Sequence, residues 1–203
     1  MSENLAVKVH RKVVMGRRVQ QISKNISNLI PEGSLSVLDV GAGTGEMAQS
    51  IQSFKPELSF TGVDVYIRPK TFIPVVKYDG NILPFDDNSF DMVIIVDVLH
   101  HCKDPVSVLK ECARVSKQHV IIKDHVSDST FDSRVLAFMD WFGNRAHGVV
   151  LPYNYLSSLE WSSAFTKAGL ISEKQITDLS LYPMPLDLIF GSSLHCIHLL
   201  VKA

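Results

Sequence analysis

The feature that most constrains this chain is a short apolar run that ends in three closely spaced glycines, Val37-Leu38-Asp39-Val40-Gly41-Ala42-Gly43-Thr44-Gly45. An apolar run of this length, bounded by glycines, is typical of a buried strand that ends in a tight turn. Glycines at a strand-to-helix turn allow backbone N–H groups to approach a ligand closely. The sequence therefore predicts a strand, a ligand-binding turn and then a helix from about Glu46 to Phe54.

Strands and helices are expected to alternate after this turn. The run from Met92 to Val96 holds five consecutive apolar residues, which favours a central parallel strand covered on both faces. A helix should begin at Pro105, because proline suits a first helical turn. The alternation predicts an α/β fold, a three-layer α/β/α sandwich around a mostly parallel sheet. The other strand candidates are Phe60–Asp64, Val75–Tyr78, Val120–Ile122 and, as an antiparallel C-terminal hairpin, Ile171–Thr177 with Ile197–Val201.

The domain organisation is expected to be simple. A length of 203 residues suits one buried core, and no internal repeat interrupts the chain, so residues 1–203 are predicted to form a single domain. Apolar residues at helical spacing predict an N-terminal helical segment over about residues 1–31, which Pro31 and Gly33 end. A lid-like insertion is expected at about residues 127–156, where the alternation of strands and helices changes.

Charge and cysteine content exclude several classes of protein. The net charge of −1 disfavours a nucleic-acid binder, although Arg11, Lys12, Arg17 and Arg18 form a small basic cluster. Three cysteines without CxxC spacing indicate a reducing compartment, and a cytoplasmic protein is expected. No apolar run reaches the length of a membrane span. The eight histidines do not show the spacing of a known ligand cluster, so no metal is expected, and the sequence leaves the oligomeric state open.

A dinucleotide-binding turn is the first alternative for the glycine-rich segment. With Gly41 and Gly43 as the first two glycines of G-x-G-x-x-G, the third position is occupied by Glu46. A charged side chain there conflicts with the close helix–strand packing of that fingerprint. The position of Glu46 therefore disfavours a nicotinamide cofactor.

The form D-x-G-x-G-x-G, with Asp39 two residues before Gly41, resembles the first motif of class I S-adenosylmethionine (SAM)-dependent methyltransferases. Three later stretches resemble the same family in the same order: Asp64 after the second strand, the run YDGNILPFDDNSFD from Tyr78, and the run VDVLHH from Val96. The similarity covers about residues 36 to 126. It is greatest to the small-molecule branch that includes ubiquinone- and menaquinone-biosynthesis methyltransferases.

This resemblance implies a Rossmann-like fold with a seven-stranded sheet, and SAM as cofactor with S-adenosylhomocysteine as product. It places Asp64 on the ribose hydroxyls, since a carboxylate can accept hydrogen bonds from both. It places Asp79 on the adenine amino group, and the stretch after Val96 beside the methionine part and the acceptor. The cofactor-binding residues expected from it are Asp39, Gly41, Ala42, Gly43, Gly45, Asp64, Val65, Asp79, Gly80, Asn81, Asp97 and Val98.

Candidate catalytic residues follow the fourth and fifth strands. Ligands of open α/β sheets lie outside the carboxyl ends of the strands, where His101 and His125 are expected. Histidine is well suited to proton transfer near neutral pH. Either histidine could instead hold a neighbouring loop by a hydrogen bond.

The segment after His125 supplies the candidate acceptor site. Val135, Phe138, Met139 and Phe142 share one apolar face of a predicted helix over Phe131–Asn144, and Asp140 and Trp141 lie on another. A flat, hydrogen-bonding small molecule would suit that second face with the tyrosines that follow it. Alternatively, Trp141 packs in the core and the tyrosines anchor a loop. The predicted acceptor-binding residues are Trp141, His147, Tyr153 and Tyr155.

The sequence is therefore interpreted as an enzyme that transfers a methyl group from SAM to a small-molecule acceptor by in-line displacement. A NAD(P)-dependent oxidoreductase and a non-catalytic SAM-binding regulatory protein remain alternatives. The identity of the acceptor, and whether a base is needed, stay open.

Overall fold

The structure is a computed structural model, and it describes the chain except for residues 1–4, 34, 145–152, 183, 185–186 and 192–193. Its strands are β1 (Ser36–Val40), β2 (Ser59–Asp64), β3 (Val75–Lys77), β4 (Phe90–Val96), β5 (Ser116–His125), β6 (Leu170–Ile176) and β7 (His195–Lys202). Its helices are α1 (Leu5–Leu29), α2 (Glu46–Phe54), the 3-10 helix η1 (Leu99–His101), α3 (Pro105–Val115), α4 (Thr130–Asn144), α5 (Ser158–Lys167) and α6 (Asp187–Phe190).

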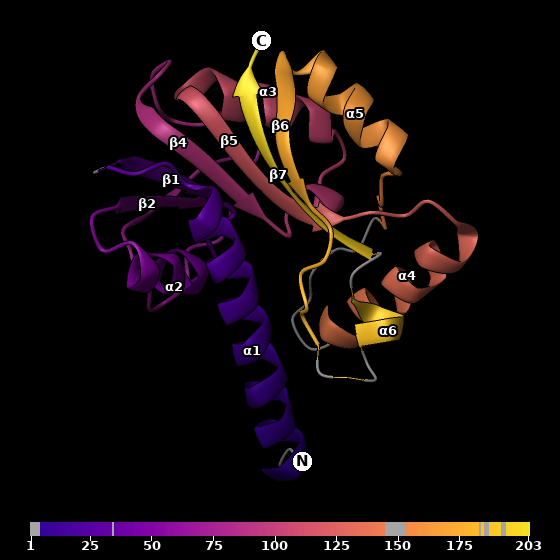
Figure 1. The fold of residues 1–203 in the computed structure, drawn as a ribbon. Coiled ribbons are helices and arrows are strands. Elements are labelled where there is room, and N and C mark those ends of the chain that lie inside the picture. Colours follow the sequence, from indigo (N-terminus) through magenta and orange to yellow (C-terminus); the bar gives the residue numbers. More distant parts are fainter. Residues whose placement is uncertain (1–4, 34, 145–152, 183, 185–186, 192–193) are drawn as a thin grey trace.

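The described strands form a seven-stranded sheet in the order β3-β2-β1-β4-β5-β7-β6 (Figure 1). The strands from β3 to β5 in this order are mutually parallel. Strand β7 lies between β5 and β6 and is antiparallel to both. The predicted mostly parallel sheet with an antiparallel C-terminal hairpin strand is confirmed.

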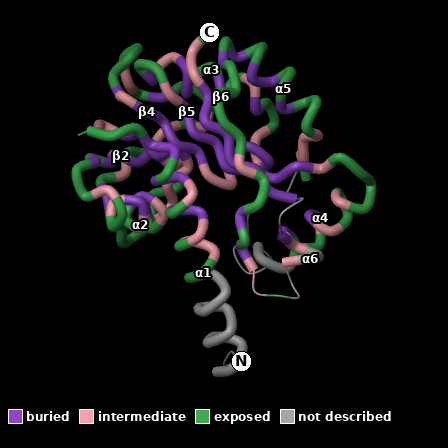
Figure 2. The backbone as a smooth tube through the Cα atoms, in the orientation of Figure 1, coloured by how far each residue is buried: buried purple, intermediate pink, exposed green. Residues whose placement is uncertain are grey.

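Two apolar cores cover the two faces of the sheet. Alternate residues of β1 belong to different cores, because successive side chains of a strand point to opposite faces. Leu38 packs in the core that holds residues of α3 and α5, whereas Val37 packs in the core that holds residues of α1 and α2. The buried part of the chain follows the strands in Figure 2. This arrangement is the predicted three-layer sandwich.

Helix α1 packs on the body through its C-terminal half. Ile22 and Ile26 are fully buried there, against the second core, and Ile30 is the last buried residue before Pro31. The N-terminal half of the α1 ribbon extends away from the sheet (Figure 1). Among the helices in the described part of the chain, none combines the length and the apolar character that a membrane span requires.

Helix α4 has the predicted extent but buries a different face. Leu136 is fully buried and Asp140 is 9% exposed, one turn further along. Phe138 is 55% exposed, so the predicted apolar face does not pack inward as a whole. The pattern misled because Leu136 and Asp140, and not Phe138, are the buried side chains of the described part of this helix. The carboxylate of Asp140 therefore points from α4 toward His100.

Candidate functional site

The glycine-rich turn after β1 is held close to the end of β2. The backbone N–H groups of Gly41 and Ala42 both donate to the carbonyl oxygen of Val63, at 2.8 and 3.0 Å. Gly41 has φ +75°, and a Cβ atom there would overlap the side chain of Val98. Gly43 and Gly45 also have positive φ, which favours glycine. The turn therefore depends on its glycines, and it brings the loop after β4 against the loop after β1.

Asp64 organises the same turn from the end of β2. Its Oδ2 accepts a hydrogen bond from the backbone N–H of Gly43 at 2.8 Å, and its Oδ1 accepts one from Tyr66 N at 2.8 Å. Each carboxylate oxygen has two lone pairs, so both oxygens can still accept from ligand hydroxyls. The carboxylate thus has the orientation and the free capacity that ribose binding requires.

Asp39 places a buried carboxyl group beneath the glycine turn. Its side chain is 3% exposed, and Oδ2 has no hydrogen-bond partner among the described residues. Burial, and secondarily the negative charge of Asp64, raises the pKa of Asp39 to about 7. A buried carboxyl oxygen without a partner is costly unless a ligand supplies a donor. Asp39 is therefore suited to a cationic or hydrogen-bond-donating part of a cofactor.

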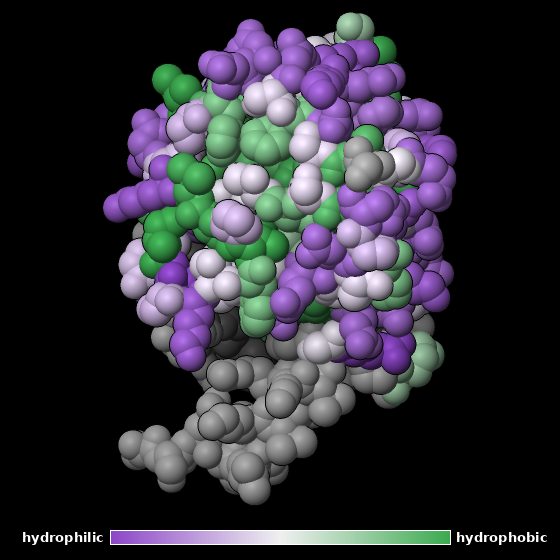
Figure 3. Space-filling view, turned by 90° about the vertical axis from the view of Figure 1, so that its left-hand side faces the viewer, coloured by the Kyte–Doolittle hydropathy of each residue, from purple (hydrophilic) through white to green (hydrophobic). Residues whose placement is uncertain are grey.

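The predicted adenine contacts lie after β3. Oδ1 of Asp79 accepts hydrogen bonds from the backbone N–H groups of Asn81 and Ile82, which lower the pKa of Asp79. A Cβ atom on Gly80 would lie 3.2 Å from the side chain of Val65, so these two loops are close together. Exposed apolar side chains surround the loops, and apolar surface is visible in the view of Figure 3. They include Val65, Tyr66, Ile67, Phe72 and Ile82.

Asp97, at the end of β4, is already paired with two cations. Arg18 of α1 donates to its Oδ2 at 2.6 Å, and the Lys123 ammonium group contacts its Oδ1. Burial acts to raise the pKa of Asp97, but the charges of Arg18 and Lys123 hold it well below its usual range. Asp97 also has a positive φ of 55°, which is uncommon for a residue other than glycine. The predicted cofactor residue thus links α1 to the strand ends.

A compact group of buried polar side chains lies where β4 and β5 end. His100 Nδ1 is 2.6 Å from Asp124 Oδ1, and His125 Nδ1 is 3.3 Å from both of these atoms. Burial acts to lower the pKa of His100, but the charge and hydrogen bond of Asp124 raise it. Burial, partly offset by Asp124, lowers the pKa of His125. We call His100, Asp124 and His125 the strand-end cluster.

Two residues of the lid-like segment join this cluster. The hydroxyl of Tyr155 donates to Asp140 Oδ2 at 2.5 Å, and the same oxygen is 3.8 Å from His100 Nε2. The ring of Tyr155 lies 5.8 Å from the His125 ring and 6.1 Å from the His100 ring. Tyr155, a predicted acceptor-binding residue, therefore lies beside His125.

The other predicted acceptor residues are less closely connected. Trp141 is 50% exposed and its nearest described ring is Phe138, at 6.2 Å. Tyr153 is 44% exposed and its ring lies 6.3 Å from Tyr155. His147 lies outside the described residues. Only Tyr155, of the described members of the predicted set, contacts the strand-end cluster.

His101 differs from its neighbour His100. Its ring is partly buried, and its Nδ1 has no partner among the residues described. Burial, and next the charge of His100, lowers the pKa of His101. Its backbone N–H donates to Val98 O at 2.9 Å, so His101 is one turn from the residue that packs on Gly41. A neutral imidazole with a free nitrogen thus lies close to the cofactor turn.

Sequence reasoning missed the importance of His100, Lys123 and Arg18. Lys123 is fully buried inside a strand, which is rare for lysine and points to a paired charge. The signal was present in the sequence, because Lys123-Asp124-His125 places three polar residues directly after a fully apolar strand segment. By contrast, the pairing of Arg18 with Asp97 joins residues 79 positions apart, and no local pattern encodes it.

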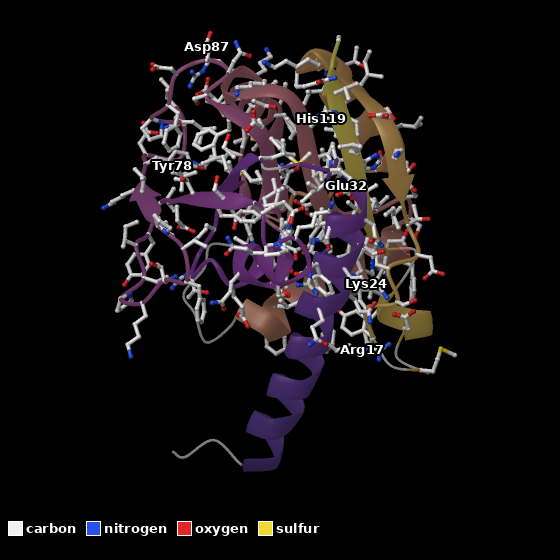
Figure 4. All side chains as sticks on the ribbon, turned by 60° about the vertical axis from the view of Figure 1, so that its left-hand side comes forward. Arg17, Lys24, Glu32, Tyr78, Asp87 and His119 are labelled. Atoms are coloured by element: carbon white, nitrogen blue, oxygen red, sulfur yellow. The ribbon has the colours of Figure 1, made fainter. Side chains whose placement is uncertain are left out.

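Asp87, at the opposite end of the sheet, takes part in a structural ion pair. Asp87 pairs with Arg114 at 2.8 Å, in the turn before β4. Figure 4 shows Asp87 and His119 in the upper part of the molecule, and Arg17 at the level where α1 leaves the sheet. The candidate site is therefore confined to the carboxyl ends of the parallel strands.

Comparison with known proteins shows similarity to methyltransferases. Residues 38–122 match a protein family described as "Methyltransferase domain". A demethylmenaquinone methyltransferase of Thermotoga maritima is 28% identical over 138 residues, which are 60% of this chain and 60% of that protein. A ubiquinone/menaquinone biosynthesis C-methyltransferase of Cupriavidus taiwanensis is 24% identical, over 60% of this chain and 58% of that protein. The chain thus matches about three fifths of the length of these curated relatives.

Solved structures share the fold over nearly the whole chain. A methyltransferase in complex with the Haloferax volcanii Trm112 methyltransferase activator has a TM-score of 0.72 at 19% identity, covering 97% of this chain and 95% of that one. A SAM-dependent methyltransferase of Thermotoga maritima has a TM-score of 0.67 at 21% identity, covering 98% and 96%. At this identity the likeness concerns the fold alone.

Proposed function

We propose that this chain, which resembles the class I SAM-dependent methyltransferases, transfers the methyl group of SAM to a small-molecule acceptor bound beside the strand-end cluster. The observation that carries the cofactor part is the buried, unpartnered Oδ2 of Asp39 beneath the glycine turn. SAM carries an ammonium group and supplies a methyl group on a positively charged sulfur, which is a good leaving group. Both positively charged groups suit a site that contains the buried carboxyl group of Asp39.

The proposed cofactor contacts follow from the loops that meet at the ends of β1 to β4. The backbone of the glycine turn, from Gly41 to Gly45, would lie against the methionine part, with Ala42 and Val98 at its sides. Asp64 would bind the ribose, next to Val65. Asp79, with Gly80 and Asn81, would border the adenine. Asp97 is proposed to lie beside the cofactor, with its carboxylate paired to Arg18 and Lys123.

The chemical demand on the protein is mainly alignment. An in-line displacement at a sulfonium methyl needs the nucleophile, methyl carbon and sulfur in one line, and positioning supplies much of the acceleration. An acceptor that arrives as a hydroxyl must also lose a proton. We propose that His101 receives it, because its Nδ1 is not used by any described residue. His125, the other predicted candidate, is instead enclosed by His100 and Asp124.

The remaining parts of the proposal concern the whole chain. Residues 1–31 and 127–156 would form caps over a single domain, and Trp141, Tyr153, Tyr155 and His147 would border the acceptor. The three cysteines carry free thiols, which supports a reducing, cytoplasmic location. The balanced charge supports a small molecule over a nucleic acid as acceptor.

The cofactor is tested first, by calorimetric titration with SAM, S-adenosylhomocysteine, NAD and NADP. Saturable binding of the first two alone is expected. Asp64→Ala should weaken SAM binding about 10- to 100-fold, since it removes hydrogen bonds to a charged group worth about 1.5–3 kcal/mol. Asp178→Ala, which removes an exposed acid after β6, is the matched control and should bind normally. Binding of NAD instead would establish the oxidoreductase alternative.

The acceptor is tested by screening phenols, quinone precursors and amines with SAM that carries a labelled methyl group. With an acceptor in hand, His101→Ala should lower turnover about 100-fold, within the usual range for a lost acid–base group, and leave SAM affinity unchanged. Full activity of this variant would remove His101 from the proposal. Binding of SAM without transfer to any acceptor would favour the non-catalytic regulatory alternative.

A further inference from the structure

The three side chains of the strand-end cluster converge on one point from two different strand ends. The separations are 2.6 Å between His100 Nδ1 and Asp124 Oδ1, and 3.3 Å from His125 Nδ1 to each of them. All three residues are buried, with exposed fractions of 3%, 0% and 4%. One ligand atom from each lies within 4.8 Å of the other two.

This spacing is within the range that one metal ion can span. Zinc binds imidazole nitrogen and carboxylate oxygen at about 2.0–2.2 Å, so two of its ligands can lie up to about 4 Å apart. The Nδ1 atoms of His100 and His125 also compete for the same hydrogen-bond partner, Asp124 Oδ1. If the proton of His100 Nδ1 is donated to Asp124 Oδ1, His125 Nδ1 is left without a partner of its own, because that oxygen also accepts from the backbone N–H of His125.

Backbone N–H groups hold the carboxylate of Asp124 in place, as hydrogen-bond donors around a metal site hold its ligands. Asp124 Oδ2 accepts a hydrogen bond from Leu99 N at 2.9 Å, and Oδ1 accepts one from His125 N at 2.7 Å. These bonds fix both the carboxylate and the turn that carries His100. Hydrogen bonds of this kind orient metal ligands and tune their affinity.

His195, the histidine of β7 that lies next to the cluster, is not a further ligand. Its ring is tilted against that of His125 at 4.9 Å, but its Nδ1 is 3.3 Å from Lys123 Nζ and its Nε2 is 3.1 Å from Phe190 O. Both of its ring nitrogens therefore have other partners. Three protein ligands with a fourth position left open is the pattern of metal sites that act on a substrate, whereas structural zinc sites have four.

We propose that His100, Asp124 and His125 bind one divalent transition-metal ion of the zinc type, whose open position takes an oxygen or nitrogen of the methyl acceptor. Two imidazoles with one carboxylate suit Zn²⁺ and its neighbours, whereas Mg²⁺ and Ca²⁺ prefer oxygen ligands. The ion binding stands on the geometry alone, and the acceptor role rests on the proposed methyl transfer. The sequence did not predict a metal because His100 lies 24 positions before Asp124 and the three ligands share no motif.

The charge of the neighbourhood indicates which acceptors would fit. Among the three ligands, Asp124 is the only carboxylate, whereas the neighbouring Asp97 is already paired with Arg18 and Lys123. A dication bound by Asp124 and two neutral histidines would therefore keep one positive charge in excess. An acceptor that binds as an oxyanion, such as a phenolate, would neutralise it. A metal ion also favours this form, because it stabilises the deprotonated state of a bound hydroxyl.

The test begins with the full-length protein, stripped with a chelator and titrated with ZnCl₂ by calorimetry. We expect one equivalent to bind, and CoCl₂ to give the visible absorption of a site with mixed nitrogen and oxygen ligands. His100→Ala and His125→Ala should each weaken Zn²⁺ binding by about 100-fold or more, since even outer-shell changes cost 10- to 100-fold. His198→Ala is the control, because His198 is a buried histidine of β7 that contacts Ser172 instead.

The possible results separate cleanly. A stripped wild-type protein that binds no stoichiometric zinc overturns the proposal, and the cluster is then an Asp–His ion pair only. Equal loss in His198→Ala also overturns it, because the binding would not depend on these ligands. SAM binding, measured on the same samples, shows whether the cofactor site is intact, so a failed metal site and a failed methyltransferase assignment are distinguished. Unchanged turnover after metal removal would overturn the acceptor role.

Discussion

Asp39 shows how one buried residue makes the stability of this protein depend on pH. Its pKa is about 7 in the folded protein, against 3.8 for an ordinary aspartate, because burial and the charge of Asp64 disfavour ionisation. Between these two values the folded state holds a proton that the unfolded state has released. Stability should therefore fall as pH rises from about 4 to 7, and then level off.

The substitution Asp39→Asn tests this, since the amide has nearly the same shape and does not ionise. We expect the free energy of unfolding of the variant to exceed that of the wild type at pH 8, and the gain to vanish near pH 4. At 1.36 kcal/mol per pKa unit the gain has an upper bound of about 4 kcal/mol. Urea titrations of ligand-free protein at both pH values measure it, and parallel pH profiles for the two proteins would contradict the assignment.

Among single residues, sequence reasoning succeeded where chemistry is local. Gly41 has positive φ at the predicted turn and Asp64 is the last residue of β2, so motif and position were sufficient to place them in the fold. It was incomplete where partners are distant. The sequence placed His125 at the strand end, but could not show that His100 and Asp124 would enclose it. Trp141, which was expected to border the acceptor, is half exposed on α4, and its acceptor role stays a prediction.

At the scale of elements, α1 is fastened to the site by a charged contact as well as by apolar packing. Arg18 reaches Asp97 from the turn of α1 that precedes the buried Ile22. Asp97 keeps Lys123 as a second partner, so losing Arg18 leaves no uncompensated carboxylate. A moderate cost is expected, below the 3–5 kcal/mol of a buried pair from which one partner is removed.

We expect Arg18→Ala to lower the free energy of unfolding by about 1–3 kcal/mol, the value of a lost hydrogen bond to a charged group. Arg17→Ala is the matched control, because Arg17 is the exposed neighbour on the same helix (Figure 4) and should change stability by less than about 0.5 kcal/mol. Chemical denaturation measures both. Equal effects would mean that helix propensity, and not the ion pair, accounts for the change.

Elements were predicted well wherever an apolar pattern was long and periodic. Helix α2 has the expected bounds, and α3 begins at Pro105 as expected. Strand β5 is longer than predicted, because its polar first residues pair with β4 although they bury little apolar surface. The short helices η1 and α6 were not predicted, since three or four residues carry no helical period.

For the whole molecule, β7 is the strand that joins β6 to the rest of the sheet. β7 pairs with β5 on one side and β6 on the other, and six of its eight residues are buried. A chain that stops before His195 would leave both neighbours with unpaired backbone groups. We expect such a variant to aggregate, as measured by light scattering. A variant that lacks only residues 1–4 is the control. A monomeric, folded truncated protein would contradict this role of β7.

The same strand also fixes an order of events during synthesis. Residues 36–125 can form the parallel part of the sheet while the ribosome is still translating, but β6 has no partner in the sheet until β7 has emerged. To complete the sheet, β7 must then pair with β5, and this pairing joins residues 70 or more positions apart in the sequence, His125 and His195 among them. Such long-range pairing is slow compared with local contacts. The nascent chain therefore passes through a stage in which the loops proposed to bind the cofactor are complete while the edge of β5 is still unpaired.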